Sequence, residues 1–164
     1  MTSAAIEVRA QAFYPMYEQR LRAHGAPFSV SAITNAERAV ELAVEYTQQR
    51  KAFGQTIADF QNTRFKIAEI HAECLAKRAF VDRCIELHLE KKLSPVDAAA
   101  AKMVCTELQV RAADECLQFF GGYGYMLEYP IARMYIDSRI RKIAGGASEV
   151  MRDIIGRELF SGRR

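Results

Sequence analysis

The strongest constraint on the fold is a helical spacing of apolar residues, broken only at short clusters of glycine, proline and polar residues. Apolar positions three or four apart mark one face of an α-helix, whereas a half-buried strand requires alternation with a period of two. No stretch of useful length shows that alternation. The sequence therefore predicts an all-α domain, a four-helix-bundle-like fold with up-down neighbours.

The spacing predicts three long helices and two or three shorter ones. The readable ones cover about 29–50, 59–91, 95–120, 130–141 and 148–160. Ser94, Pro95 and Asp97 are typical of a helix start, because each suits the unpaired N–H groups of a first turn. Thr34 and Glu37 fit a capping box. Gly54 is a good residue to follow a helix end near Arg50, and Pro130 is suited to open a helix.

Composition places the chain among ordinary globular proteins. It has 164 residues, half of them apolar, and a net charge of +3, which is too small to argue for nucleic acid. We find no membrane span and no signal-peptide pattern, and we predict a cytoplasmic protein. The four cysteines lack metal-ligand spacing and indicate packed thiols in a reducing compartment, with no metal. Residues 1–28 are poorly readable and fit either a domain remnant or a partly disordered tail.

Polar or glycine-rich interruptions at helix ends are the candidate sites, over residues 50–61, 118–125 and 143–149. Arg50 offers a fork for a phosphate, and Phe53 a flat face for a base. Gly121 and Gly122 allow close approach of a ligand to the backbone. Plainer alternatives are a surface charge for Arg50, a core plug for Phe53 and a helix C-cap for the glycines.

Carboxylates that could act as a catalytic base are scarce in these interruptions. Asp59, Glu128 and Glu149 are the candidates, and helix capping explains Asp59 and Glu149 equally well. No Ser-His-Asp order or Cys-His pair has a supporting pattern. The residues by themselves predict a nucleotide or phosphate site without a catalyst.

Several motifs in one order resemble the C-terminal helical domain of the acyl-CoA dehydrogenases, most closely the long-chain-like and bacterial branches. The resemblance covers about residues 29–164. The motifs are Gln49-Arg-Lys-Ala-Phe-Gly-Gln55, Phe60-Gln61, Gln118-x-x-Gly-Gly-Tyr-Gly-Tyr125, Glu128-Tyr-Pro-Ile-Ala-Arg133, Asp137-Ser-Arg139 and the run Ile-Ala-Gly-Gly-Ala-Ser-Glu-Val-Met-Arg at 143–152.

The resemblance implies FAD as cofactor and α,β-dehydrogenation of acyl-CoA thioesters. Family members pass their electrons to an electron-transfer flavoprotein, and their C-terminal domain builds a homodimer or homotetramer. The family's N-terminal and β domains are not in this chain, so a partner subunit could also supply them. No nucleic acid or membrane is expected as a partner.

Site residues carry over from the resemblance position by position. The resemblance implies that Arg50 contacts the FAD diphosphate, Phe53 the adenosine and Gln61 the flavin. It also implies that Gln118, Gly121 and Gly122 contact the diphosphate of a neighbouring subunit's FAD. Ala147, Ser148 and Glu149 match the family's Thr-Ser-Glu beside the flavin. Gly145 and Gly146 match the turn against the reacting carbons of the thioester.

The sequence departs from the family at the catalytic base. Many members carry a glutamate where this chain has Gly145, and others place it at a position that corresponds to the region of His24, where this chain has no carboxylate. Glu18 is about a turn early, and His24 stands in a helix-breaking cluster, so neither is a good base. We therefore predict an FAD-contacting, oligomer-forming domain with no catalytic residue, inactive alone. The alternatives are a non-enzymatic helical binding module and a chain that folds without a function.

Overall fold

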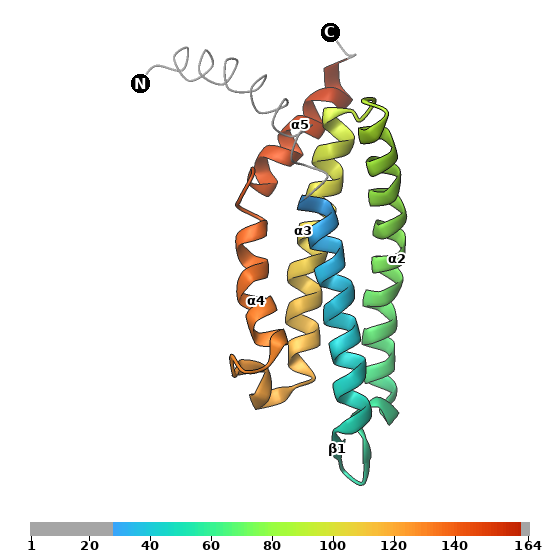
Figure 1. The fold of residues 1–164 in the computed structure, drawn as a ribbon, viewed down its shortest axis with the longest axis vertical. Coiled ribbons are helices and arrows are strands. Elements are labelled where there is room, and N and C mark those ends of the chain that lie inside the picture. The colour runs from blue at the N-terminus through green and yellow to red at the C-terminus, as the bar shows by residue number, and fades with distance from the viewer. Residues whose placement is uncertain (1–27, 162–164) are drawn as a thin grey trace, which may run out of the picture.

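Long antiparallel helices dominate the computed structural model, which describes residues 28–161 (Figure 1). A first helix covers residues 28–49, and a small hairpin of β1 (Lys51–Ala52) and β2 (Gln55–Thr56) follows. The remaining elements are η1 (Ile57–Asp59), α2 (Gln61–Leu89), α3 (Pro95–Gln118), η2 (Gly121–Tyr125), α4 (Pro130–Arg141) and α5 (Ser148–Ser161). The all-α prediction is confirmed, and its helix bounds are right to within about two residues.

Helix α3 is the central element, because α2, α4 and α5 all pack against it. A helix with neighbours on several sides is apolar around most of its circumference, and its side chains must be small where the neighbours approach. Ala98, Ala99, Ala101 and Ala112 are at most 1% exposed. The small residues of α3 therefore allow three elements to share one central helix.

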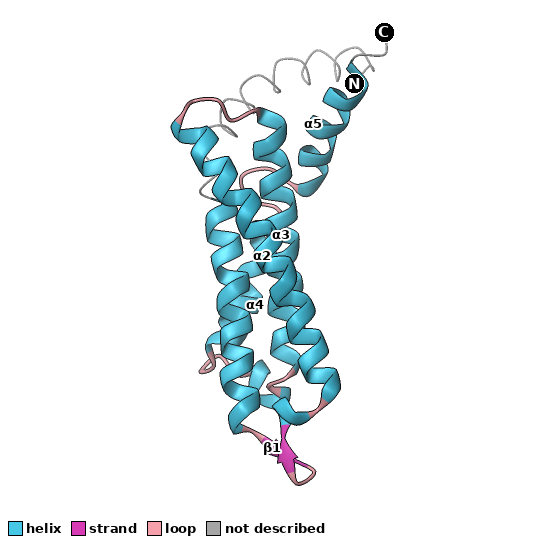
Figure 2. Ribbon diagram, turned by 90° about the vertical axis from the view of Figure 1, so that its right-hand side faces the viewer, coloured by secondary structure: helices cyan, strands magenta, loops and turns pink. Residues whose placement is uncertain are grey.

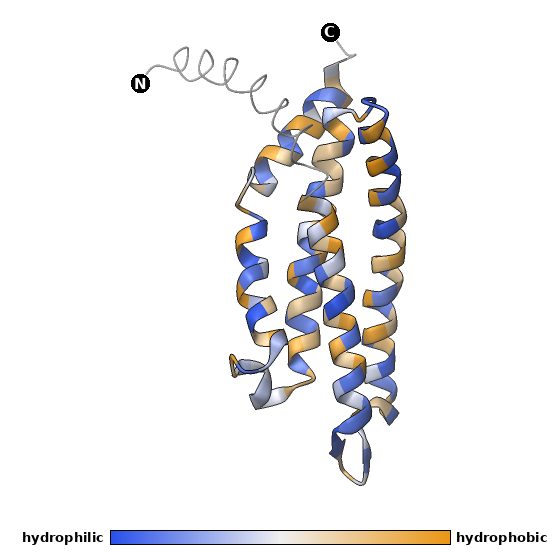
Figure 3. Ribbon diagram, viewed as in Figure 1, coloured by the Kyte–Doolittle hydropathy of each residue, from blue (hydrophilic) through white to orange (hydrophobic). Residues whose placement is uncertain are grey.

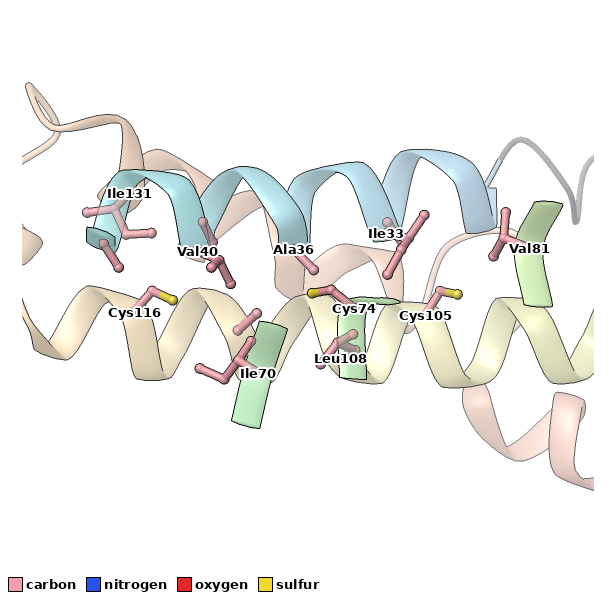
Figure 4. Packing of buried hydrophobic residues seen from close by; sticks show 14 of the residues in the cluster. Ile33, Ala36, Val40, Ile70, Cys74, Val81, Cys105, Leu108, Cys116 and Ile131 are labelled. Atoms are coloured by element: carbon pink, nitrogen blue, oxygen red, sulfur yellow. The ribbon is translucent and has the colours of Figure 1, made fainter. Parts of the chain in front are cut away.

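The main hydrophobic core lies between the 28–49 helix, α2 and α3 (Figure 4). Ile33, Ile70, Cys74 and Leu108 lie in its middle, and Cys116 lies toward the end that Ile131 closes. A second, smaller cluster joins the other end of α3 to α5. Hydrophilic and hydrophobic residues are interspersed along the whole length of each helix (Figure 3). No helix of residues 28–161 is long and apolar enough to cross a membrane.

Helix starts follow the predicted local chemistry at two places. The Ser94 hydroxyl accepts a hydrogen bond from the Asp97 N–H at 3.0 Å, and Pro95 is the first residue of α3. Pro130 opens α4 in the same way. A proline at this position loses nothing, because its missing N–H has no acceptor within the helix.

The capping box predicted at Thr34 and Glu37 is wrong. Both residues lie within the 28–49 helix and bind Arg78 of α2 instead. The Arg78 Nε donates to Glu37 at 2.9 Å, and its Nη2 donates to the Thr34 hydroxyl at 2.9 Å. Two guanidinium donors on one carboxylate fix the relative register of the two helices. The three-residue spacing that suggested a cap instead places Thr34 and Glu37 where both bind Arg78 of the neighbouring helix α2.

The segment after the first helix forms a hairpin, which the sequence did not predict (Figure 2). Phe53 and Gly54 adopt positive φ values of 53° and 83°, as the two central residues of a two-residue hairpin turn with right-handed twist require. Gly54 is thus a turn residue rather than a helix C-cap. Strands of two residues are too short for a period-two pattern to reveal.

All four cysteines are free and buried, so we predict that their thiols are inert in the folded protein. Burial raises the pKa of Cys74 to about 11 and those of Cys105 and Cys116 to about 12. Only the thiolate is a good nucleophile, and mildly alkaline buffer leaves these groups protonated. A chromogenic thiol reagent should label none of them in native protein and all of them in urea. Rapid labelling of native protein would contradict this packing.

Candidate functional site

A pocket of about 620 Å³ lies at the end of the bundle that carries the hairpin. It brings together Arg50 and the segment at the end of α3, which are distant in the sequence. Its lining residues are Tyr46, Arg50, Ala52, Ile57, Gln118, Phe119, Phe120, Gly121, Gly122, Tyr123 and Met126. Arg50, Gln118, Gly121 and Gly122 were predicted to contact a ligand, and the fold places all four around one cavity.

Tyr46, Phe120 and Tyr123 line this pocket, and the Tyr129 ring packs against all three. Tyr46 and Phe120 stack with their ring centroids 4.1 Å apart, and Tyr129 meets both rings edge-on. Tyr123 stacks on Tyr129 at 5.3 Å. Burial raises the pKa of the Tyr46 phenol, while the charge of Arg50 lowers it by a smaller amount. The rings provide a rigid, mostly apolar surface behind a single cation.

The backbone of Arg50 is fixed on both sides, while its side chain is exposed. Its N–H donates to Tyr46 at 2.9 Å, and its carbonyl accepts from Ile57 at 2.8 Å. No hydrogen bond or ion pair of the guanidinium to another residue of the 28–161 region is present. A fork of free donors on a fixed backbone can bind an oxyanion in two-point geometry.

Two glycines leave part of the pocket lining without side chains. Gly121 has a φ of 57°, and no atom lies within 4 Å of the place where a Cβ would stand on Gly121 or Gly122. The absence of side chains lets a ligand approach the peptide groups directly. Gly121 and Gly122 thus both form the tight turn after α3 and leave its peptide groups accessible to a ligand.

Phe53 and Gln61 lie outside this pocket. The Phe53 ring is 95% exposed at the tip of the hairpin and meets Phe60 edge-on at 6.4 Å, which rules out a core plug. Gln61 is exposed as the first residue of α2. Nearby, the Asp59 carboxylate accepts hydrogen bonds from the N–H and hydroxyl of Thr56, and these bonds lower its pKa. Asp59 therefore serves as a cap.

A second predicted region is the turn at residues 144–147, which connects α4 to α5. Gly145 and Gly146 have φ values of 63° and 110°, in the region that glycine adopts most easily. The Lys102 side chain of α3 reaches this turn, and its Nζ donates to the carbonyls of Ala144, at 2.9 Å, and of Gly146. Sequence reasoning missed Lys102, although a lysine among Ala98–Ala101 and Val104 was a visible signal.

Phe28 closes the turn from the side. A Cβ on Gly145 would stand 2.8 Å from the Phe28 ring, and Lys102 Nζ lies 5.5 Å from the ring centroid. The Arg141 guanidinium is 5.7 Å from the same centroid. Two cations at these distances from one ring are attracted by its quadrupole.

The residues that begin α5 differ in their burial. Ser148 is 5% exposed, and its hydroxyl has no hydrogen-bond partner among residues 28–161. Glu149 is exposed and lies 3.9 Å from Arg152 as an ion pair. Ala147 is half-buried, and its carbonyl accepts from the N–H groups of Val150 and Met151. A buried hydroxyl without a partner marks a place for a missing acceptor or donor.

The turn and the pocket belong to opposite halves of the bundle. Lys102 holds the turn and Gln118 lines the pocket, and both are residues of α3. Their separation along the helix axis is about 24 Å. His24 and Glu18, the weak base candidates, lie outside the described residues.

These features define a helical-bundle domain with candidate ligand contacts at its helix ends. The family model described as "Acyl-CoA dehydrogenase, C-terminal domain" matches residues 18–160. The chain belongs to the acyl-CoA dehydrogenase family, in its C-terminal domain.

Relatives and solved structures agree with this assignment. The long-chain specific acyl-CoA dehydrogenase, mitochondrial, of Rattus norvegicus is 44% identical over 130 residues, which are 79% of this chain and 30% of that protein. The butyryl-CoA dehydrogenase structure from Megasphaera elsdenii has a TM-score of 0.85 at 35% identity, covering 90% of this chain and 38% of the other. A Bacillus anthracis acyl-CoA dehydrogenase complexed with FAD has a TM-score of 0.80 at 31% identity, with 87% and 28% covered. The chain thus spans about a third of the length of these relatives.

We predict opposite effects of alanine at two glycines. Gly145→Ala should lower the free energy of unfolding by about 1–3 kcal/mol, because it combines a positive φ with a clash against Phe28. Gly156→Ala, within α5, has free space around it and should raise that free energy by about 0.5–1 kcal/mol. Urea unfolding of both variants measures this. Equal effects would mean that the turn is not held as described.

We also predict a pH-dependent contribution of Lys102 to stability. Burial lowers its pKa from 10.5 to about 8 in the folded protein. Below both values the group is charged in folded and unfolded protein alike. Between them the unfolded chain binds a proton that the folded chain has released, so the free energy of unfolding rises with pH, by on the order of 3 kcal/mol in all.

The comparison with Lys102→Met isolates this contribution from the titrating cysteines. The free energy of unfolding of wild type minus that of the variant should rise between pH 8 and 10.5, measured by urea unfolding at a series of pH values. A difference that does not change with pH would contradict the lowered pKa.

Proposed function

We propose that this chain is the FAD-contacting and oligomer-forming domain of an acyl-CoA dehydrogenase, which acts on acyl-CoA thioesters. The observation that carries the proposal is the pocket that joins Arg50 with Gln118, Gly121 and Gly122. Family membership and the FAD complex of the Bacillus anthracis relative support it. Bound FAD supplies the acceptor for a hydride from the substrate.

The residues of this chain fit such a cofactor in two places. At the pocket, the Arg50 fork and the open glycines suit the diphosphate, since they pair a free cation with accessible peptide groups. At the start of α5, the unpartnered hydroxyl of Ser148 suits a polar edge of the flavin ring. Ala147 and Glu149 flank it.

The other assigned residues complete this arrangement. Phe53, exposed at the hairpin tip, offers its ring to the adenosine, and Gln61 its amide to the flavin. Gly145 and Gly146 face the thioester through their backbone, since Phe28 occupies the side on which a Gly145 side chain would stand. The positive φ of both glycines supports this role, because few other residues adopt that conformation without strain.

The separation of the two regions supports assembly from several copies. The pocket and the 144–147 turn are about 24 Å apart along α3, so each serves a different FAD molecule or a different end of one. In a homodimer or homotetramer, the pocket of one copy completes the FAD site of another. Exposed isoleucines of α4 and the following residues, Ile136, Ile140 and Ile143, share a helical spacing and suit burial against a second copy.

The chain alone is inactive in this proposal, because Gly145 leaves no side chain where many relatives place their base. Turnover then depends on further domains, from a longer protein or from a partner subunit. An electron-transfer flavoprotein receives the electrons in the complete enzyme. The buried, free thiols fit the reducing cytoplasm, while the rat relative is named as mitochondrial.

Binding of FAD to two arginine variants tests the cofactor contact. Arg50→Gln should weaken FAD binding roughly tenfold or more, because it removes a charge-assisted hydrogen bond to the diphosphate. Arg83→Gln, on the exposed side of α2, is the matched control and should leave the affinity unchanged. Titration of FAD fluorescence measures both.

The alternative, a non-enzymatic helical module, makes different predictions. A colourless protein that leaves FAD fluorescence unchanged would favour it over the cofactor-binding domain. Equal FAD affinities of Arg50→Gln and Arg83→Gln would show that Arg50 does not contact FAD. Light scattering after size exclusion tests assembly, and a strict monomer would contradict the oligomer-forming role.

A further inference from the structure

Lys102 has a role that the family motifs do not assign. Among residues 28–161, Lys102 is the only buried residue with a charged side chain, and it is 1% exposed. Removing an ammonium group from water is costly unless it is hydrogen-bonded, so its position requires a structural reason. That reason is the 144–147 turn, which lies more than forty residues away in the sequence.

The two hydrogen bonds of Lys102 bring two carbonyl oxygens of the turn to one point. The carbonyls of Ala144 and Gly146 both accept from the same nitrogen. Such convergence requires the backbone between them to curl, which the positive φ values of Gly145 and Gly146 allow. Two converging carbonyl dipoles repel each other, and a cation between them reverses that repulsion. The glycines permit this shape, and the ammonium stabilises it.

The remaining contacts of the turn do not replace this clamp. The Ser148 N–H donates to the Lys142 carbonyl at 3.2 Å, which closes the loop at its base. Phe28 contributes its ring, and Arg141 is the other cation near that ring. Burial is the cause of the lowered pKa of Lys102, and no carboxylate among the described residues offsets it. The peptide carbonyls are therefore its main partners.

We propose that Lys102 is a positioning residue, whose ammonium ties the Ala144 and Gly146 carbonyls together and so fixes the thioester- and flavin-facing side of the turn. It sets the direction of the peptide N–H groups around Gly145 and Gly146. It also sets the place of the Ser148 hydroxyl, which begins α5 directly after the turn. The identity of the ligand on that side rests on the proposed function, whereas the clamp itself does not.

Amide NMR of the full chain tests the clamp without any cofactor. In wild type, the Gly145 and Gly146 amide signals should shift with a midpoint near pH 8, as Lys102 loses its proton. That titration should vanish in Lys102→Met. Exchange of the Ser148 amide should become roughly tenfold to a hundredfold faster in the variant, the effect expected for loss of a hydrogen bond to a charged group.

Thr106→Val is the matched control for a general loss of stability. Thr106 lies one turn further along α3, is equally buried, and bonds only to its own helix. Its replacement should leave the glycine titration and the Ser148 exchange rate unchanged. Equal Ser148 exchange rates in Lys102→Met and Thr106→Val would overturn the clamp.

FAD titration separates this proposal from the proposed function. Weaker FAD binding by Lys102→Met than by Thr106→Val supports both. A loosened turn with unchanged affinity would overturn the flavin-side role of the clamp. Wild type that does not bind FAD would overturn the proposed function, and the Ser148 exchange comparison between Lys102→Met and Thr106→Val would then decide about Lys102.

Discussion

The burial of α3 on several sides is the constraint on which the rest of the structure depends. Three helices pack against it, and this is possible because its residues there are small. Close packing fixes the neighbours relative to one another, since interiors at crystal-like density tolerate little shift. Both candidate regions are attached to this helix, one at its C-terminal end and one through a side chain near its start.

Lys102 shows how a costly group can be placed in such a helix. Its burial is unfavourable for the charged form, which its lowered pKa expresses. The same burial makes its hydrogen bonds to the turn strong, because little water competes for the carbonyls. A turn of two glycines is flexible by nature, so a clamp from the rigid centre of the bundle gives it a defined shape. The Ser148 hydroxyl, which has no hydrogen-bond partner among residues 28–161, begins α5 directly after this turn.

The two candidate regions lie far apart because they are attached to different parts of one long helix, α3. A long bundle separates its ends by the length of its helices, so contacts at both ends cannot converge on one small group. At the pocket, the Cβ positions of Gly121 and Gly122 are open, whereas at the turn the Phe28 ring covers the Cβ position of Gly145. The two regions are therefore separate candidate sites, each attached to α3.

Much of the architecture could be predicted from the sequence, because it depends on local physics. Apolar spacing predicted the helices, and Ser94 and Pro130 predicted two of their starts. The Arg50 and Gln118–Gly122 motifs were recognised, as was the absence of a side chain at Gly145. The hairpin escaped prediction, because two-residue strands carry no period. Thr34 and Glu37 were wrongly predicted to cap a helix, because their partner Arg78 is distant in the sequence.

The sequence by itself determined which residues could serve a nucleotide: an arginine fork, and glycines at helix ends. Only the tertiary structure decided which of them meet. It placed Arg50 with Gly121 and Gly122, left Phe53 and Gln61 outside the pocket, and brought Lys102 to the glycine turn. The physical reason is that spacing along a helix fixes a face and an end, whereas contact between distant residues depends on how the helices pack.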